Sequence, residues 1–442
     1  MEKKQKVRKE KGITLVALVV TIIVLIILAG VTLNIVLDQN GIINKAQQAT
    51  EDYDTAQREE QELLGVVEDY IEYAGKTAPI PEGYTKSQIT TEDDVAEGVV
   101  IYEIPEGATV NWTDNEDEKG KNQSTITIGE NTTNLQETVN QYVWIPVEDI
   151  NSMVMCKSNS GESVCNLVYD ADEDTLTCTT HPDTANDLVG RLYEGTDGYT
   201  TDDGNFMISY TLNFTQRDQT YDANSDRREP AIITGNSGAN YDGDSSNLKI
   251  AGMSAESTAE QFLTQLKSDF TAMAKSVAKS GGFYISRYEV GANGESKKGQ
   301  TVLADASSDN IEENYLGAGN WYGLYNTIRN INANKQMIWG CQYDQVIKFI
   351  GDEAQIGHSD RNLTIDHALA GQNELDCMKN IYDLEGNHQE WTAEATLNRA
   401  RARRGSYYPS ADDGVFSSAS FSVSSPPDYS SNTGSSRTTL YL

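Results

Sequence analysis

The order of apolar and polar positions separates an amino-terminal apolar segment from a long remainder of short mixed segments. Residues 13–37 are 25 consecutive positions without a charged side chain. As a helix, this stretch would be roughly 37 Å long, which exceeds the hydrocarbon core of a bilayer at about 30 Å. The pattern therefore predicts a transmembrane helix over 13–37.

A second helical pattern follows this segment. Apolar residues recur at intervals of three, four or seven from Ile42 to Ala74, with charged and amide side chains between them. This spacing is typical of an amphipathic helix, and Asn40-Gly41 is its expected kink. We expect the transmembrane and amphipathic parts to form one long element over 13–75, followed by a Pro-containing linker over 76–97.

The remainder, residues 98–442, mixes strand and helix patterns. Short β-rich runs between polar turns predict strands. Apolar residues at helical spacing predict two amphipathic helices packed on a core. Strands mixed with a few helices indicate the α+β class. The expected strands are Val99–Tyr102, Thr125–Ile128, Tyr142–Ile145 and Phe283–Val290, and the expected helices are Ala255–Lys279 and Met337–Ile350.

Residues 151–250 differ in composition from their surroundings. They are polar and rich in Asp, Asn, Thr, Ser and Gly, which indicates a large loop-rich insertion. The insertion holds three of the five cysteines. Cys156 and Cys165 could pair in an exported protein, and free thiols are the alternative. A structural zinc site is not expected, because the sequence has no Cys-x-x-Cys motif and only four histidines.

Charge is distributed unevenly along the chain. The 34 Lys and Arg residues against 67 Asp and Glu residues give a net charge of −33, which argues against a nucleic-acid partner. Residues 1–12 are nevertheless basic. Basic residues before an apolar span and acidic residues after it predict a cytoplasmic amino terminus and an exported remainder. A cleavable secretory signal fits less well, because its apolar stretch would be about 7 to 15 residues long.

The sequence Lys11-Gly12-Ile13-Thr14-Leu15, followed by the apolar run, resembles the start of type IV prepilins and pseudopilins. The resemblance implies a basic leader over 1–12 that prepilin peptidase removes by cutting between Gly12 and Ile13. It also implies other pilin-like subunits as partners. Ala17 stands where the family usually has the Glu that helps to register subunits in a filament, which counts against polymerisation. An uncleaved signal anchor is the alternative.

A second resemblance concerns the carboxy-terminal half. Asn380–Trp391 reads NIYDLEGNHQEW, and Arg404-Gly405-Ser406-Tyr407 and Arg437 follow it. Together with Gln141–Val147 and Phe283–Val290, these motifs resemble the formylglycine-generating-enzyme (sulfatase-modifying factor) family. The fold of that family is related to the C-type lectin fold. The expected fold class is therefore α+β, with a long amino-terminal helix followed by a C-type lectin-like domain.

The turn after Asp383 offers a set of hard oxygen ligands. Gly386 permits a tight turn, so that two carboxylates and two backbone carbonyls can face one point, as Ca²⁺ prefers. The family resemblance likewise implies Ca²⁺ here. The alternative is that the carboxylates pair with Arg404 or Arg437 and that no ion is bound. The candidate calcium ligands are Asp383, Gly386, His388 and Glu390.

Catalytic motifs are missing from the sequence. The oxidases of the resembled family hold copper with two cysteines close to the Arg-Gly-Ser segment, yet residues 401–442 contain no cysteine. The sequence also lacks a Gly-x-Ser-x-Gly elbow, a Walker-type loop and histidines paired at helical spacing. We therefore expect a protein that is not an enzyme, with Cys341 and Cys377 as buried structural thiols. An exported enzyme of the formylglycine-generating type is the alternative.

The last forty residues have the composition of a recognition surface. Aromatic, Asp and Asn side chains lie among many serines, and this mixture combines contact area with adaptable hydrogen bonds. A disordered Ser-rich tail is one alternative. The tail also resembles the variable region of lectin-fold proteins diversified by retroelements. The candidate ligand-binding residues are Tyr407, Tyr408, Asp412, Asp413, Phe416, Tyr429 and Asn432.

Taken together, these patterns predict a single-pass protein of the cell membrane with an exported head. The head would bind an unknown extracellular ligand without catalysis, as in adhesion, at the cell surface or on a pilus. A structural minor pilin whose head caps or initiates a filament is a further alternative.

Overall fold

The structure is a computed structural model and describes most of the chain beyond residue 76. The chain divides into two compact units, Met1–Ala74 and Gly75–Leu442. Only the second contains described residues, so the expected transmembrane and amphipathic segments, Gly12 and Ile13 lie outside them. The described residues are 77–118, 120–157, 167–178, 206–209, 213–216, 219–222, 227–228, 259–303, 321–332, 334–351, 369–372, 376–384, 386–396, 401–405, 422–425 and 434–442.

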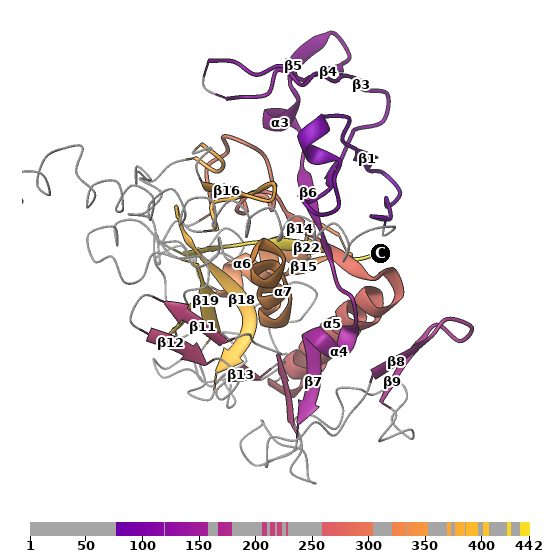
Figure 1. The fold of residues 1–442 in the computed structure, drawn as a ribbon, viewed down its shortest axis with the longest axis vertical. Helices are drawn as coiled ribbons and strands as arrows, with labels where there is room; N and C mark the ends of the chain where they lie inside the picture. The colour runs from indigo at the N-terminus through magenta and orange to yellow at the C-terminus, as the bar shows by residue number, and fades with distance from the viewer. Residues whose placement is uncertain are drawn as a thin grey trace, which may run out of the picture. The chain divides into compact units, whose positions relative to one another are not determined.

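An antiparallel six-stranded sheet forms the centre of the second unit, in the order β1-β2-β6-β14-β22-β15. The strand nearest the carboxyl end of the sequence, β22, lies inside the sheet between β14 and β15 (Figure 1). The strands are β1 (Thr85–Lys86), β2 (Val100–Tyr102), β6 (Gln141–Pro146), β14 (Gly282–Ser286), β15 (Lys335–Met337) and β22 (Thr438–Leu440).

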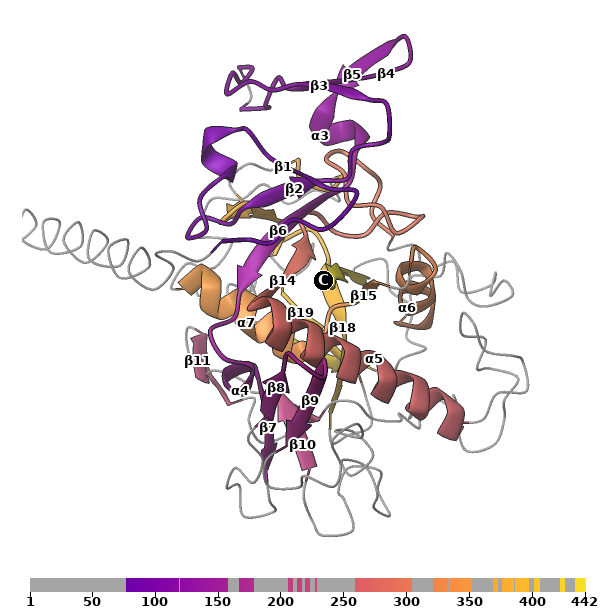
Figure 2. The same cartoon turned by 90° about the vertical axis from the view of Figure 1, so that its right-hand side faces the viewer.

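The central strands β6 and β14 are buried at every position. Alternate side chains of a strand point to opposite faces, so full burial requires a cover on both faces. One face carries a core of six buried residues. On the other side, α5 (Ala259–Ser280) contacts β14 and α7 (Gly340–Ile350) contacts β6, as Figure 2 shows. The six core residues are Val99, Ile101, Tyr142, Trp144, Tyr284 and Leu440.

A second sheet carries the Gly-Asn-x-x-Glu-Trp motif. Its order is β13-β18-β19-β20, and β21 pairs in parallel with the first residues of β18. The helix α6 (Trp321–Arg329) packs against this sheet, since Trp321 Nε1 donates to the Thr392 carbonyl at 2.8 Å. The strands are β13 (Arg227–Arg228), β18 (Gln389–Thr396), β19 (Arg401–Arg404), β20 (Ser422–Ser425) and β21 (Gly434–Ser436).

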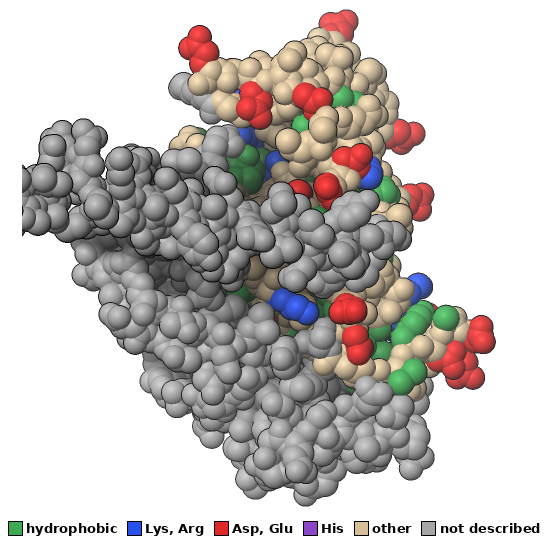
Figure 3. All heavy atoms as spheres, viewed as in Figure 1, with side chains coloured by type: hydrophobic (Ala, Val, Ile, Leu, Met, Phe, Trp, Pro, Cys, Tyr) green, Lys and Arg blue, Asp and Glu red, His purple; other side chains and the backbone are tan. Residues whose placement is uncertain are grey.

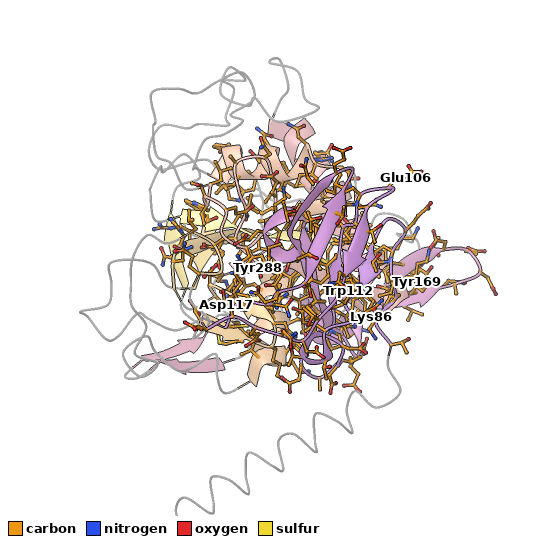
Figure 4. The ribbon with its side chains drawn as sticks, turned by 90° about the horizontal axis from the view of Figure 1, so that it is seen from above. Lys86, Glu106, Trp112, Asp117, Tyr169 and Tyr288 are labelled. Atoms are coloured by element: carbon orange, nitrogen blue, oxygen red, sulfur yellow. The ribbon has the colours of Figure 1, made fainter. Side chains whose placement is uncertain are left out.

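Smaller elements surround the two sheets. In one of them, the Asn134 side chain accepts hydrogen bonds from the backbone N–H groups of Gln136 and Glu137 and so caps a short helix. Figure 4 labels Tyr169, which lies on the β8–β9 hairpin. These elements are the three-stranded sheet β3 (Thr109–Asn111), β4 (Thr125–Ile128) and β5 (Asn131–Asn134); the pairs β7 (Val154–Lys157) with β10 (Phe206–Ser209), β8 (Leu167–Asp170) with β9 (Thr175–Cys178), β11 (Asn213–Gln216) with β12 (Gln219–Asp222) and β16 (Cys377–Met378) with β17 (Ile381–Tyr382); and the short helices η1 (Thr90–Glu92), α3 (Leu135–Thr138) and α4 (Ile150–Met153).

The fold class expected from the sequence is wrong. The described part of the chain is a mixed, sheet-rich architecture with few helices, and no helix in it is long and apolar enough to cross a membrane. Its longest helix, α5, has 22 residues and carries charged side chains along its length. The error has a physical cause, because a short motif such as Asp383–Trp391 determines a local turn. The arrangement of strands depends on pairings between distant segments.

Individual elements were predicted more accurately. Strands occupy the three runs expected between residues 98 and 147, and α5 covers most of the expected helix 255–279. The prediction of one helix over 337–350 was wrong at its start, because residues 335–337 pair with β22 as β15. The helix begins at Gly340, and the Gln342 side chain accepts the Trp339 N–H just before it. The strand expected over 283–290 ends at Ser286.

Candidate functional site

The side chain of Arg437 is the centre of a buried ionic cluster, which we define as Glu289, Asp383, Glu390 and Arg437. Arg437 Nε and Nη2 each lie 3.0 Å from Glu390 Oε1, and both side chains are fully buried. The same guanidinium donates to the carbonyls of Ser286, Arg287 and Tyr382. One arginine therefore joins β14, β17 and β18, and all five contacts are strong because the donor is charged.

Glu289 holds the turn between Asp383 and His388. Its carboxylate accepts hydrogen bonds from Asn387 Nδ2 at 2.5 Å and from the His388 N–H at 3.0 Å. Asp383 Oδ2 accepts the Gly371 N–H at 2.6 Å. Asp383 and Asn387 both have positive φ angles, 63° and 61°, which short polar side chains tolerate better than others. The turn is thus fixed from inside the protein.

The cluster contains more acids than bases. Burial raises the pKa of Asp383 to about 6, although the Arg437 charge acts in the opposite direction. Burial also raises the pKa of Glu289, and the Asp383 charge raises it further. The pKa of Glu390 is raised by burial against the opposing charge of Arg437. Three buried carboxyl groups share one guanidinium. Some of them therefore keep a proton at pH values where an exposed carboxyl group is ionised.

A second buried ion pair lies next to this cluster. Arg404 Nη2 is 2.9 Å from Asp344 Oδ1, and the Arg404 guanidinium carbon lies 5.6 Å from the centre of the Tyr343 ring. Gly405 follows with φ 72°, and a Cβ there would stand 2.6 Å from both Glu390 Oε2 and the Leu384 carbonyl oxygen. The Arg-Gly pair therefore requires glycine for its close packing against the motif.

The cluster fixes both ends of one long segment, residues 406–433. The segment follows β19 and Gly405 and precedes β21, which begins at Gly434. Glu390 pairs with Arg404 of β19 on one side and with Ser435 of β21 on the other. Within the segment, β20 pairs with β19. The two ends of the segment therefore lie on the two strands that flank β18 at Glu390.

The predicted calcium ligands Asp383 and Glu390 come together in the fold, and both contact protein groups. Glu390 pairs with Arg437, which is the ion pair that the sequence left open as an alternative, and Asp383 accepts from Gly371. Among the residues that the structure describes, no group of three or more His, Cys, Asp or Glu side chains is arranged to hold a metal ion. Calcium at Asp383, Gly386, His388 and Glu390 stays a prediction, which calorimetric titration with Ca²⁺ would test.

Several other predicted residues cannot be placed. The candidate ligand-binding residues lie outside the described part of the chain, as do the processing residues Gly12 and Ile13. The same holds for Cys165 and for the side chain of Cys156. Cys341 is buried on α7, as expected, whereas Cys377 on β16 is only partly buried. The unplaced ligand-binding residues are Tyr407, Tyr408, Asp412, Asp413, Phe416, Tyr429 and Asn432.

The sequence reading missed Glu289 and Arg287 as site residues. Both are charged residues within the otherwise mostly apolar run Phe283–Val290. A charge in such a run indicates a buried charge with a partner, and this was the sequence feature that could have identified them. Arg287 Nη1 lies 2.6 Å from Glu92 Oε1, and both side chains are 3% exposed. Tyr288, which Figure 4 labels, lies between these two residues in sequence and is fully buried.

The described surface is acidic. Figure 3 shows Asp and Glu side chains distributed over the visible described face, with fewer Lys and Arg side chains between them. This distribution agrees with the net charge of −33.

Comparison of the chain with known protein families finds no match, and comparison with curated proteins finds none either. The two resemblances drawn from short motifs therefore stay predictions.

Proposed function

We propose that the protein is a non-catalytic binding protein that presents residues 406–433 to an extracellular ligand. The supporting observation is the position of the two ends of this segment, on strands β19 and β21 that both pair with β18 at Glu390. Loops carried by a rigid scaffold are the usual carriers of binding function. The Tyr, Ser, Asp and Asn content of the segment suits contacts with a ligand.

The buried ionic cluster supports a framework role for the motif. Glu390 and Arg437 are both 0% exposed, and each has an internal charged partner. A group that performs acid–base chemistry must come within hydrogen-bond reach of its substrate. These enclosed groups hold the two ends of the segment 406–433 in place, and residues of the segment itself make the contacts with the ligand.

The proposal includes the location of the protein. The apolar residues 13–37 attach the chain to the cell membrane, and the basic leader before Ile13 stays on the cytoplasmic side until prepilin peptidase cuts after Gly12. Two features support this part: the charge asymmetry around 13–37 and the resemblance at Lys11–Leu15. Expression in hosts with and without the peptidase tests it. An identical size in both hosts would contradict processing.

The binding proposal is tested with the full chain, solubilised in detergent and applied to arrays of glycans and of extracellular peptides. We expect binding to at least one array component. A variant with Tyr407, Tyr408 and Tyr429 changed to Ser should lose binding roughly tenfold or more, because aromatic residues supply much of the contact energy. Its melting temperature should stay that of the unmodified protein.

Tyr169→Ser is the matched control, because this tyrosine lies on the β8–β9 hairpin outside the segment and is partly exposed. It should leave binding unchanged. Absence of binding to every array component, or equal binding by the triple variant, would contradict the proposal. Oxidation of a cysteine-containing peptide by the copper-loaded chain would favour the enzyme instead.

A further inference from the structure

Lys335 is a buried lysine in a polar and aromatic enclosure. Its side chain is 1% exposed, and Nζ lies 2.9 Å from Glu103 Oε2 and 3.2 Å from Glu103 Oε1. The rings of Tyr84 and Tyr142 stand 5.9 Å and 5.1 Å from the same nitrogen. Lysine is rarely buried to this extent in proteins, so the arrangement calls for a specific role.

Asn140 is the second side chain that donates to the Glu103 carboxylate, beside Lys335. Asn140 Nδ2 donates to Glu103 Oε2 at 2.9 Å, so one oxygen atom contacts the nitrogens of both the amide and the lysine. Asn140 Nδ2 and Lys335 Nζ each lie 2.9 Å from this oxygen atom, so the two nitrogen atoms are at most twice that distance apart. Asn140 Oδ1 accepts the Ser296 N–H at 2.8 Å. The backbone also fixes the pair, because the Glu103 N–H donates to the Asn140 carbonyl at 3.0 Å.

We propose that Lys335 and Asn140 join in an intramolecular isopeptide bond, with Glu103 as the proton carrier. Glu103 takes a proton from Lys335 Nζ, and the neutral amine attacks Cγ of Asn140. The Ser296 N–H stabilises the negative charge that develops on Oδ1. Glu103 returns the Lys335 proton to Nδ2, the Cγ–Nδ2 bond breaks and ammonia leaves. The second proton of the attacking nitrogen passes through the Glu103 carboxylate to the ammonia, so that the products are a neutral amide and an ammonium ion. One C–N bond forms, one breaks, and no oxidant is required.

Three features distinguish this group from an ordinary ion pair. The carboxylate contacts nucleophile and leaving group through one oxygen, the amide carbonyl already accepts a backbone N–H, and the aromatic rings keep water from the amine. Glu103 keeps 35% of its side chain exposed, which gives the released ammonia a route to solvent. The pair Lys121–Glu137, by comparison, lies at the surface, where its side chains are 30% and 47% exposed.

The bond would connect the edge strand of the central sheet to the start of an inner strand. Lys335 lies on the outer strand β15, and Asn140 immediately precedes β6, with β14 and β22 between the two strands. Such a link constrains the unfolded chain in the way a disulfide does, but it is insensitive to reductants.

Peptide mapping of the purified full chain by tandem mass spectrometry tests the proposal. We expect one cross-linked peptide pair joining Asn140 to Lys335, lighter than its two components by one ammonia. Glu103→Gln should slow formation of the bond by roughly 100-fold or more, since it removes the proton carrier. Glu137→Gln is the matched control, because it changes the surface pair with Lys121 and should leave the cross-link intact.

Lys335→Arg keeps the positive charge but cannot form this bond, so a folded Lys335→Arg protein should yield no cross-linked pair even if Glu103→Gln fails to fold. Ammonia loss from the whole protein does not decide the question, because the Asn293-Gly294 sequence can lose ammonia by ring closure on its own backbone. Recovery of the Asn140 and Lys335 peptides from the folded protein, separate and unmodified, would overturn the proposal.

Discussion

Arg437 and Glu390 form an ion pair at 3.0 Å in which neither side chain has any exposed surface. Arg437 lies between β21 and β22, whereas Glu390 lies on β18, so the pair connects the two sheets of the described structure. Burial removes both charges from water, and each charge compensates the other. If one of them is removed, the remaining charge is buried without a partner, which destabilises the fold. The pair therefore makes the fold sensitive to changes at either residue.

Replacement of Arg437 by Met should lower the free energy of unfolding by about 3 to 5 kcal/mol, since it leaves the Glu390 charge buried alone. Urea denaturation monitored by circular dichroism measures this. The double variant Glu390→Gln with Arg437→Met should recover much of the loss, because it removes both charges.

Lys86→Ala is the control for the ion-pair prediction. Lys86 pairs with Asp93, and their side chains are 44% and 54% exposed, so its loss should cost at most about 1 kcal/mol. If Arg437→Met cost no more than Lys86→Ala, the framework role of the cluster would be wrong.

Gly405→Ala should destabilise the protein by roughly 3 kcal/mol or more. The residue has φ 72°, and the added Cβ would stand 2.6 Å from the Glu390 carboxylate and from a backbone oxygen. Gly107→Ala separates the two causes, because Gly107 has a similar φ of 78° but no atom within 4 Å of the new Cβ. It should cost only about 1 kcal/mol. Equal losses in thermal denaturation would show that the close packing has no energetic weight.

Stability should rise as the pH falls from 7 to about 4. The pKa of Asp383 is raised to about 6 in the folded protein from 3.8, so the folded state binds a proton that the unfolded state lacks across this window. The difference between these two pKa values corresponds to about 3 kcal/mol of folding free energy, which is present below pH 4 and lost as the pH rises through 6. Glu289 and Glu390 act in the same direction.

Urea midpoints at pH 4.5 to 7 for the unmodified protein and for Asp383→Asn measure this effect. The variant should show a smaller dependence on pH. A midpoint that falls on acidification from pH 7 to 5 in the unmodified protein, with the same slope in Asp383→Asn, would contradict the assignment.

The cross-link also has a thermodynamic signature. A bond between residues 140 and 335 closes a loop of about 195 residues. Loss of this constraint raises the entropy of the unfolded chain, which lowers the free energy of unfolding by about 5 kcal/mol at 25 °C. Lys335→Arg should therefore shift the denaturation midpoint strongly, whereas Lys121→Arg should not. Similar midpoints for both variants would indicate that Lys335 forms only its ion pair with Glu103 and no covalent bond.

Local patterns in the sequence were sufficient for many elements. Strand β6 and helix α5 were expected because their apolar residues repeat with the periods of strand and helix over a few turns. Helix α6 was not expected, because Trp321–Arg329 is short, contains Gly323 and is rich in aromatic residues that favour strands. The membrane-spanning expectation rests on residues that lie outside the described structure.

Contacts between distant segments were the part that the sequence could not supply. Glu92 and Arg287 are 195 residues apart, and no local pattern relates them. Glu390 was expected to bind either calcium or an arginine, and only the fold brings Arg437 next to it. Glu289 was missed as a site residue because its partner Asn387 comes from another strand region. The expected fold class failed for the same reason, since strand order is a property of such long-range pairings.

The position of β22 between β14 and β15 has a consequence for biosynthesis. On the ribosome, β14 emerges about 150 residues before Thr438–Leu440, and β15 about 100 residues before them. Strand β14 can pair with β6 before then, but β15 is joined to the sheet through β22, so this part of the sheet cannot close until the late segment is made. Until then the edges of β14 and β15 that face β22 stay unpaired, which creates a need for chaperones during synthesis.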